Sequence, residues 1–165
     1  MAQNQEYLIH EIDCFLKEQP RFLIVKKREV VHLSGYYFVN LSHLGFAVQM
    51  AYQVDILVPR KFPKKLPQVF YNKRLIPIGY DHCYSNGRLC LETDECQKDY
   101  LKKNPNLTKF LEIFLGNYLF GMEYYRKYSI LPFGEWSHGE TGVNGYLKQR
   151  NEFIERLRYY GSKRR

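Results

Sequence analysis

The chain lacks a long uninterrupted run of apolar residues. A membrane-spanning helix needs about 20 consecutive residues that are mostly apolar, and no window of the sequence approaches this length. Residues 1–6 are polar and contain no hydrophobic region of the kind that a secretory signal has. These absences argue against membrane association and predict a soluble, cytoplasmic protein.

Closely spaced cysteine pairs are also missing. The four cysteines, at positions 14, 83, 90 and 96, form no Cys-x-x-Cys pair, so we expect reduced thiols rather than a disulfide framework. Several residues of metal-ligand type occur, namely His82, Cys83, Cys90, Cys96 and His138. Because their spacing matches no familiar zinc pattern, we predict no metal and no other cofactor.

Internal repeats, low-complexity tracts and linkers are absent as well. A chain of 165 residues has the usual size of one domain. We therefore expect residues 1–165 to form a single domain, with residues 141–165 as a C-terminal helix and basic tail.

The charge of the chain is unbalanced, with 25 Lys and Arg against 17 Asp and Glu and a formal net charge of +8. Such an excess raises nucleic acid as a partner. Its best support is the basic tail, which contains Arg156, Arg158, Lys163, Arg164 and Arg165. Basic chain ends are usually solvated, however, and most of the aromatic residues fall in periodic segments typical of a core. Nucleic-acid binding is therefore the less favoured alternative.

The order of periodic segments predicts an α+β fold. Apolar residues recur at helical spacing in residues 6–18, where the expected buried face contains Leu8, Ile9, Ile12, Phe15 and Leu16. Strands are expected at residues 22–25 and 30–33, as two short strands or one long one, and at residues 35–40, 45–58 and 68–71, in an antiparallel meander. No period is sustained through residues 72–90, and helices are expected at residues 109–127 and 141–159.

Two motifs surround this irregular segment. Phe62-Pro63-Lys64-Lys65-Leu66-Pro67 precedes it, and His82-Cys83-Tyr84-Ser85-Asn86-Gly87-Arg88-Leu89-Cys90-Leu91 ends it. The second motif places Cys90 between two leucines after a glycine turn, eight residues beyond His82. A thiol with a nearby hydrogen-bond donor is the minimum equipment for acyl transfer through a thioester. The alternative is that Cys90 is an ordinary small buried residue.

These motifs resemble those of ubiquitin-conjugating (E2) enzymes, and the resemblance covers roughly residues 35–125. It implies the E2 fold, with an N-terminal helix, an antiparallel β-meander, an irregular active-site segment and C-terminal helices. It also implies that Cys90 carries another protein's C-terminus as a thioester and passes it to an amine.

The chain departs from the family pattern after His82, where Cys83-Tyr84 stands in place of Pro-Asn. Two alignments are open: His82 is a structural histidine and the oxyanion-stabilising Asn is deleted, or His82 stands where that Asn stands. We favour the second, because the Asn of the resembled pattern also stands eight residues before the cysteine, and histidine can donate the same hydrogen bond. A carboxylate that accepts the amine's proton is also expected, and Asp94 is our candidate among Glu92, Asp94, Glu95 and Asp99.

The resemblance also implies partners. An E1-like activating enzyme and a ubiquitin-like modifier, or another protein with a reactive C-terminus, would come from other chains. The Trp136-Ser137-His138-Gly139 segment is similar to one in bacterial E2-like proteins; His138 either reaches the cysteine or belongs to a rigid connection. Bacterial E2-like proteins occur in anti-phage (CBASS) operons, where the partner is a CD-NTase, a cGAS-like nucleotidyltransferase. The competing interpretation on the same fold is a non-catalytic E2-variant binding module.

Overall fold

The computed structural model describes residues 2–27, 29–43, 45–80 and 82–132, which lie in one compact unit, Met1–Phe133. The expected helix at 141–159, the basic tail and the segment with Trp136 and His138 lie outside the described residues. The described residues form an α+β arrangement of an N-terminal helix, a four-stranded antiparallel sheet and C-terminal helices.

The first helix, α1 (Ala2–Glu18), starts before the predicted segment and ends before Pro20. Leu8, Ile12 and Phe15 are buried as the helical spacing predicts. Ile9 was expected on the same face but is 50% exposed, which corrects that prediction. Helical positions i and i+1 point about 100° apart, so Ile9 stands at the edge of the buried stripe.

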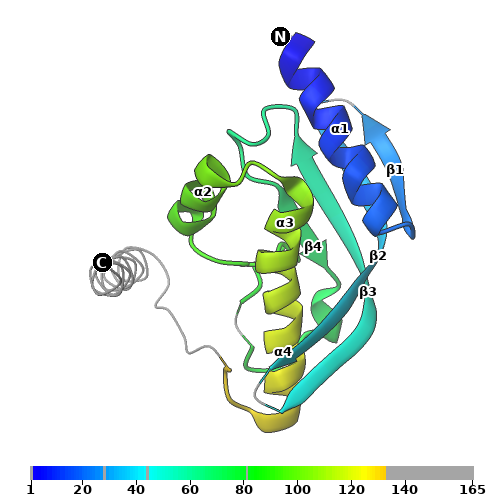
Figure 1. Ribbon diagram of the computed structural model, residues 1–165. Coiled ribbons are helices and arrows are strands. Elements are labelled where there is room, and N and C mark those ends of the chain that lie inside the picture. The colour runs from blue at the N-terminus through cyan, green and yellow to red at the C-terminus, as the bar shows by residue number, and fades with distance from the viewer. Residues whose placement is uncertain (1, 28, 44, 81, 133–165) are drawn as a thin grey trace, which may run out of the picture. The chain divides into compact units, whose positions relative to one another are not determined.

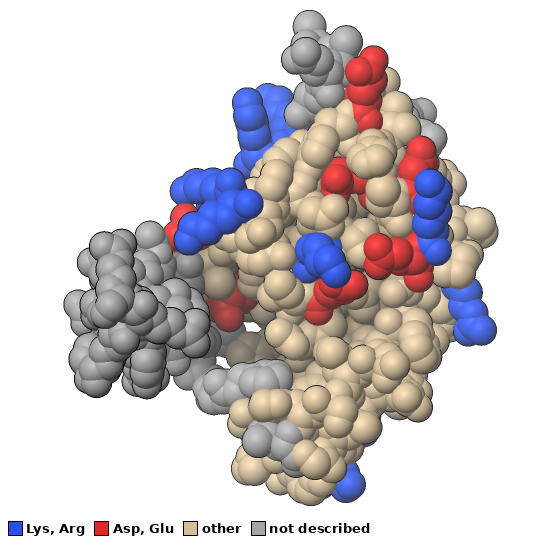
Figure 2. Space-filling view, in the orientation of Figure 1, with Lys and Arg blue, Asp and Glu red and all other residues tan. Residues whose placement is uncertain are grey.

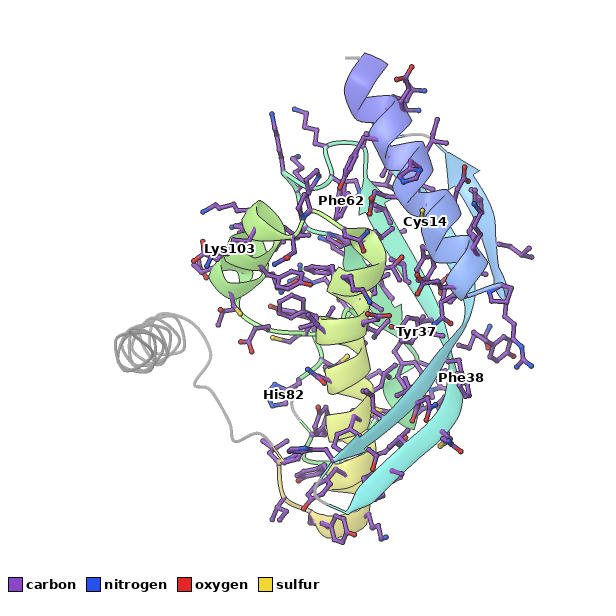
Figure 3. The ribbon with its side chains drawn as sticks, in the orientation of Figure 1. Cys14, Tyr37, Phe38, Phe62, His82 and Lys103 are labelled. Atoms are coloured by element: carbon purple, nitrogen blue, oxygen red, sulfur yellow. The ribbon has the colours of Figure 1, made fainter. Side chains whose placement is uncertain are left out.

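The sheet is a simple meander in the order β1 (Phe22–Lys27), β2 (Val30–His43), β3 (Phe46–Pro59) and β4 (Gln68–Tyr71). Alternation along β2 puts Tyr37 in the core and leaves Phe38 52% exposed, on opposite sides of the strand (Figure 3). The predicted alternation in β3 is confirmed except at Met50, which is 49% exposed.

The predicted strands 30–33 and 35–40 are one strand, because Gly35 continues β2 without a break. A Cβ atom at this position would lie 2.2 Å from the carbonyl oxygen of Arg21. Only glycine lets β2 pass this close to the start of β1, so Gly35 serves a tight backbone crossing rather than a turn.

The C-terminal half of the unit contains α2 (Asp94–Lys103), α3 (Leu107–Leu111), a π-helical turn (Glu112–Gly116) and α4 (Asn117–Tyr128). The last three are consecutive, and Asn106 caps them by accepting a hydrogen bond from the Lys109 N–H at 2.8 Å. Figure 1 shows α1, α3 and α4 on one face of the sheet. Within the described residues, no helix has both the length and the apolar character needed to cross a membrane.

Candidate functional site

The segment that ends at Cys90 is a small β-hairpin. The backbone N–H of Cys90 donates to the His82 carbonyl at 2.9 Å, and that of Tyr84 donates to the Arg88 carbonyl at 2.8 Å. Gly87 forms the turn with a φ of +84°, a conformation that suits glycine. Asn86 supports the turn by accepting a hydrogen bond from the Arg88 N–H at 3.1 Å. The last part of the segment without sequence period, residues 82–90, is therefore held by its own backbone hydrogen bonds.

This hairpin is bonded to the edge of the sheet. The Leu89 N–H donates to the Val69 carbonyl at 2.8 Å, and the Tyr71 N–H donates to the Gly87 carbonyl at 3.0 Å. The hairpin thus continues the sheet beyond β4. Because Leu89 is also buried, its side chain anchors the neighbouring Cys90 at the rim of the core.

The register of the hairpin decides which side chains face each other. Cys83 pairs with Leu89, so His82 lies opposite Cys90 and Tyr84 lies opposite Arg88. Side chains alternate between the two faces of a strand pair, which puts these last four residues on one face. Cys83 is on the other face, where its Sγ lies 3.4 Å from the Tyr84 carbonyl oxygen.

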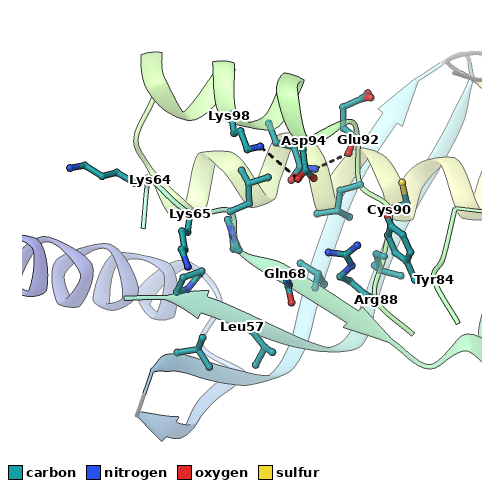
Figure 4. Close-up of a pocket in the computed structure, with 18 residues that line it drawn as sticks. Leu57, Lys64, Lys65, Gln68, Tyr84, Arg88, Cys90, Glu92, Asp94 and Lys98 are labelled. Atoms are coloured by element: carbon teal, nitrogen blue, oxygen red, sulfur yellow. Dashed lines mark hydrogen bonds and ion pairs between the residues drawn. The ribbon is translucent and has the colours of Figure 1, made fainter. Parts of the chain in front are cut away.

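Cys90 is only partly buried and lines a groove of about 420 Å³. The groove runs between the loop after β3, strand β4, the hairpin and the start of α2 (Figure 4). An ordinary core cysteine would face apolar side chains alone, whereas this groove also contains Tyr84, Glu92 and Asp94. The Cys90 side chain is therefore only partly shielded from solvent and has polar neighbours.

Tyr84 is the group that most lowers the pKa of the Cys90 thiol, because its hydroxyl is placed to act on the thiol as a hydrogen-bonding group. Burial raises the pKa of Tyr84 above its usual 10.0, so its hydroxyl keeps its proton and can donate. The guanidinium carbon of Arg88 lies 4.0 Å above the centre of the Tyr84 ring. Sequence reasoning treated Tyr84 only as a departure from the family pattern; its diagonal position to Cys90 in a hairpin was the missed signal.

The environment raises the pKa of the Cys90 thiol above its ordinary value of 9.0. Burial is the main cause, and the carboxylates of Glu92 and Asp94 add to it. The Tyr84 hydrogen bond and the Arg88 charge act in the opposite direction and stabilise the thiolate. At neutral pH the thiol is therefore protonated, and a base has to remove its proton before attack. Arg88 follows the hairpin turn directly, is half-buried and lines the groove.

His82 contacts the thiol's residue through its backbone carbonyl. Its ring packs edge-on against Tyr80, with ring centres 5.1 Å apart. The structure therefore places both histidine and tyrosine on the face of the hairpin that bears Cys90, and of the two it is the Tyr84 hydroxyl that lowers the pKa of the thiol.

Asp94 is the first residue of α2, and the preceding residue, Thr93, is the N-cap of this helix. It lines the groove with Cys90 and forms an exposed ion pair with Lys98 at 3.8 Å. Glu92 lies closer to the core, and burial raises its pKa although its carboxylate accepts a hydrogen bond from the Thr93 N–H at 2.8 Å. A carboxylate with a raised pKa is the better proton acceptor, so Glu92 joins Asp94 as a candidate base.

The residues around Cys90 thus supply a nucleophile, a neutral donor and two carboxylates. Over the described part of the chain, no group of three or more His, Cys, Asp or Glu side chains could hold a metal ion. The function is inferred from this local chemistry, because the chain matches neither any of the protein-family models nor any of the curated proteins with which it was compared.

Proposed function

We propose that this protein is an E2-like acyl transferase that carries another protein's C-terminus as a thioester on Cys90 and transfers it to an amine. The observation that carries the proposal is the thiol of Cys90 in an open groove that Tyr84, Glu92 and Asp94 also line. The order of helix, antiparallel meander, irregular segment and helices is compatible with an E2 fold and supports the same proposal.

Loading exchanges one thioester for another. The sulfur of Cys90 loses its proton, attacks the thioester carbonyl of the delivering enzyme, and expels that enzyme's thiolate, which takes up a proton. Tyr84 and Arg88 stabilise the Cys90 thiolate, as their effects on its pKa indicate. The raised pKa keeps the thiol unreactive until a carrier and a base are both in place.

Discharge transfers the acyl group from sulfur to nitrogen. A neutral amine attacks the carbonyl of the Cys90 thioester, negative charge develops on the carbonyl oxygen, and the Cys90 thiolate leaves and is reprotonated. Tyr84 and His82 are the candidate donors to that oxygen. Glu92 or Asp94 accepts the proton that the attacking amine loses.

The activating E1-like enzyme and the modifier, or the protein whose C-terminus is conjugated, come from other chains. We place this activity in the cytoplasm of a bacterium, within a CBASS-type anti-phage system in which a CD-NTase is the partner. The support for this setting is the resemblance of the Trp136 to Gly139 segment to bacterial E2-like proteins.

A peptide with a C-terminal thioester of a small thiol tests the loading step without an E1. Wild-type protein is expected to gain the mass of the peptide acyl group at Cys90 and to release the small thiol. Cys83→Ser should load like the wild type, because Cys83 lies on the other face of the hairpin. Cys90→Ser should form no thioester that hydroxylamine or a reducing thiol removes. Loading that survives loss of Cys90 contradicts the proposal.

The raised pKa of Cys90 specifically favours one alternative, a non-catalytic binding module on the same fold. A protonated thiol in such a module would only fill space. The same experiment separates the two functions, because in a binding module Cys90 exchanges with the peptide thioester no faster than a free cysteine with the same thiolate fraction.

A further inference from the structure

The groove beside Cys90 has an uneven charge that the transfer chemistry does not explain. Its charged side chains are Lys64, Lys65, Arg88 and Lys98 against Glu92 and Asp94. They come from three separate segments, namely the loop after β3, the hairpin and the start of α2 (Figure 4). In Figure 2, Lys and Arg side chains gather over α2 and over the loop between β3 and β4.

The two carboxylates of the groove are already engaged. Asp94 forms an ion pair with Lys98, and the Glu92 carboxylate accepts the Thr93 N–H. Lys64 and Lys65 are exposed, and neither forms an ion pair with any of the described residues. The loop end of the groove is therefore left with uncompensated positive charge.

Apolar side chains line the groove between these charges. Leu66, Val69 and Leu89 are among its lining residues, and Val69 and Leu89 are almost fully buried. An apolar floor with charges at its border suits an extended peptide, whose side chains can reach both. It suits a nucleic-acid strand less well, because Glu92 and Asp94 would repel phosphates.

We propose that the groove binds an acidic, extended segment just upstream of the C-terminus that Cys90 carries. This inference rests on the proposed function, because the thioester places the last residue of the carried protein at the Cys90 end. Aspartate or glutamate side chains a few residues upstream then contact Lys64 and Lys65. The charge of the groove thus selects among C-terminal tails before any chemistry occurs.

The binding test uses Cys90→Ala protein, so that no covalent loading interferes. The probe is a fluorescently labelled peptide rich in glutamate near its C-terminus, and its match carries glutamine in place of every glutamate. The glutamate peptide is expected to bind with at least about tenfold higher affinity than its match, measured by anisotropy at low salt. Adding Lys64→Glu and Lys65→Glu should remove most of this difference.

The control variant carries Lys17→Glu and Arg21→Glu, which change the net charge equally at exposed positions outside the groove. It should bind the glutamate peptide within about twofold of the parent. If the Lys64 and Lys65 variant and the Lys17 and Arg21 variant lose binding equally, the peptide is attracted to the overall charge of the protein and not to the groove. That result overturns the proposal. Tighter binding of a short single-stranded oligonucleotide, lost in the Lys64 and Lys65 variant, also overturns it and assigns the groove to nucleic acid.

The outcome for the groove is separable from the outcome for the transferase. If wild-type protein loads a glutamate-rich and a glutamine-rich peptide thioester at the same rate, the transferase stands and the groove proposal is wrong. The opposite result is that no peptide thioester loads but Cys90→Ala protein binds the acidic peptide through Lys64 and Lys65. In that case the proposed transferase activity is wrong and the groove binds acidic peptides for another purpose. Selection of a carried C-terminus is then overturned as well.

Discussion

The hydroxyl of Tyr84 acts on the thiol of Cys90 across the hairpin that bears both residues and lowers the pKa of that thiol. Tyr84 is opposite Arg88 in the register, so it is the diagonal neighbour of Cys90, and Arg88 packs over its ring at 4.0 Å. The reactivity of the Cys90 thiol therefore depends on how the hairpin positions the side chain of Tyr84.

Tyr84→Phe removes the hydroxyl and keeps the ring under Arg88. The pKa of Cys90 should rise further, because a hydrogen bond that favours the thiolate is lost. Alkylation of Cys90 by iodoacetamide near pH 8 is expected to slow by about two- to tenfold, measured by intact mass. Tyr36→Phe, at an exposed position on β2, is the matched control and should leave the rate unchanged. Equal rates for Tyr84→Phe and wild type would show that the hydroxyl has no effect on the thiol.

The pH dependence of the wild-type thiol follows from its raised pKa. Below that pKa the thiolate fraction rises about tenfold per pH unit, so alkylation of Cys90 should still be increasing above pH 9. An unperturbed thiol would be levelling off there. A plateau below pH 9 would mean that Arg88 and Tyr84 outweigh burial.

Glu92→Gln separates two roles of one carboxylate. Its negative charge raises the pKa of Cys90, so alkylation near pH 8 should become faster when the charge is removed. If Glu92 also accepts the proton of the attacking amine, discharge of the loaded peptide to free lysine should slow by about 10²- to 10⁴-fold. Glu95→Gln, exposed on α2, is the control for both rates. Unchanged discharge would assign the base to Asp94.

His82→Ala tests the alternative donor. The variant should load the peptide thioester at the wild-type rate but discharge it to lysine about 10²- to 10³-fold more slowly, if histidine donates to the developing oxyanion. The two rates are measured by mass spectrometry of the loaded protein over time. Impaired loading with normal discharge would instead give His82 a structural role, in keeping with its contact with Tyr80.

Gly87→Ala tests how the hairpin turn holds Cys90 in place. The position has a φ of +84°, and a Cβ atom would lie 3.1 Å from the Tyr71 carbonyl oxygen. Forcing alanine into this conformation should cost about 1–3 kcal/mol of unfolding free energy in urea. Gly45→Ala is matched in φ, at +73°, but has no atom within 4 Å of its Cβ. Only Gly87→Ala should also change the alkylation rate of Cys90; a change of that rate in both variants would contradict a local effect.

The sequence predicted the helices and strands whose buried residues recur at a regular spacing. Helix α1, the alternation in β3 and the long helical run after Asn106 all bury one periodic face, and a periodic face is visible in the sequence. Helix α2 was missed because it buries only Gln97 and Leu101, too few residues to make a period. The π-helical turn was missed as well, since it interrupts a pattern that continues on both sides.

The sequence by itself determined the α+β class, the glycine turn and the choice of Cys90 as the candidate nucleophile, because each depends on residues adjacent in the chain. Only the tertiary structure decided that Tyr84 acts on the thiol, that Arg88 lines the groove, and that Lys64 and Lys65 form no ion pair with any of the described residues. These outcomes depend on distances between segments that are separate in the chain, and the hairpin is held at its distance from the sheet by its hydrogen bonds to β4.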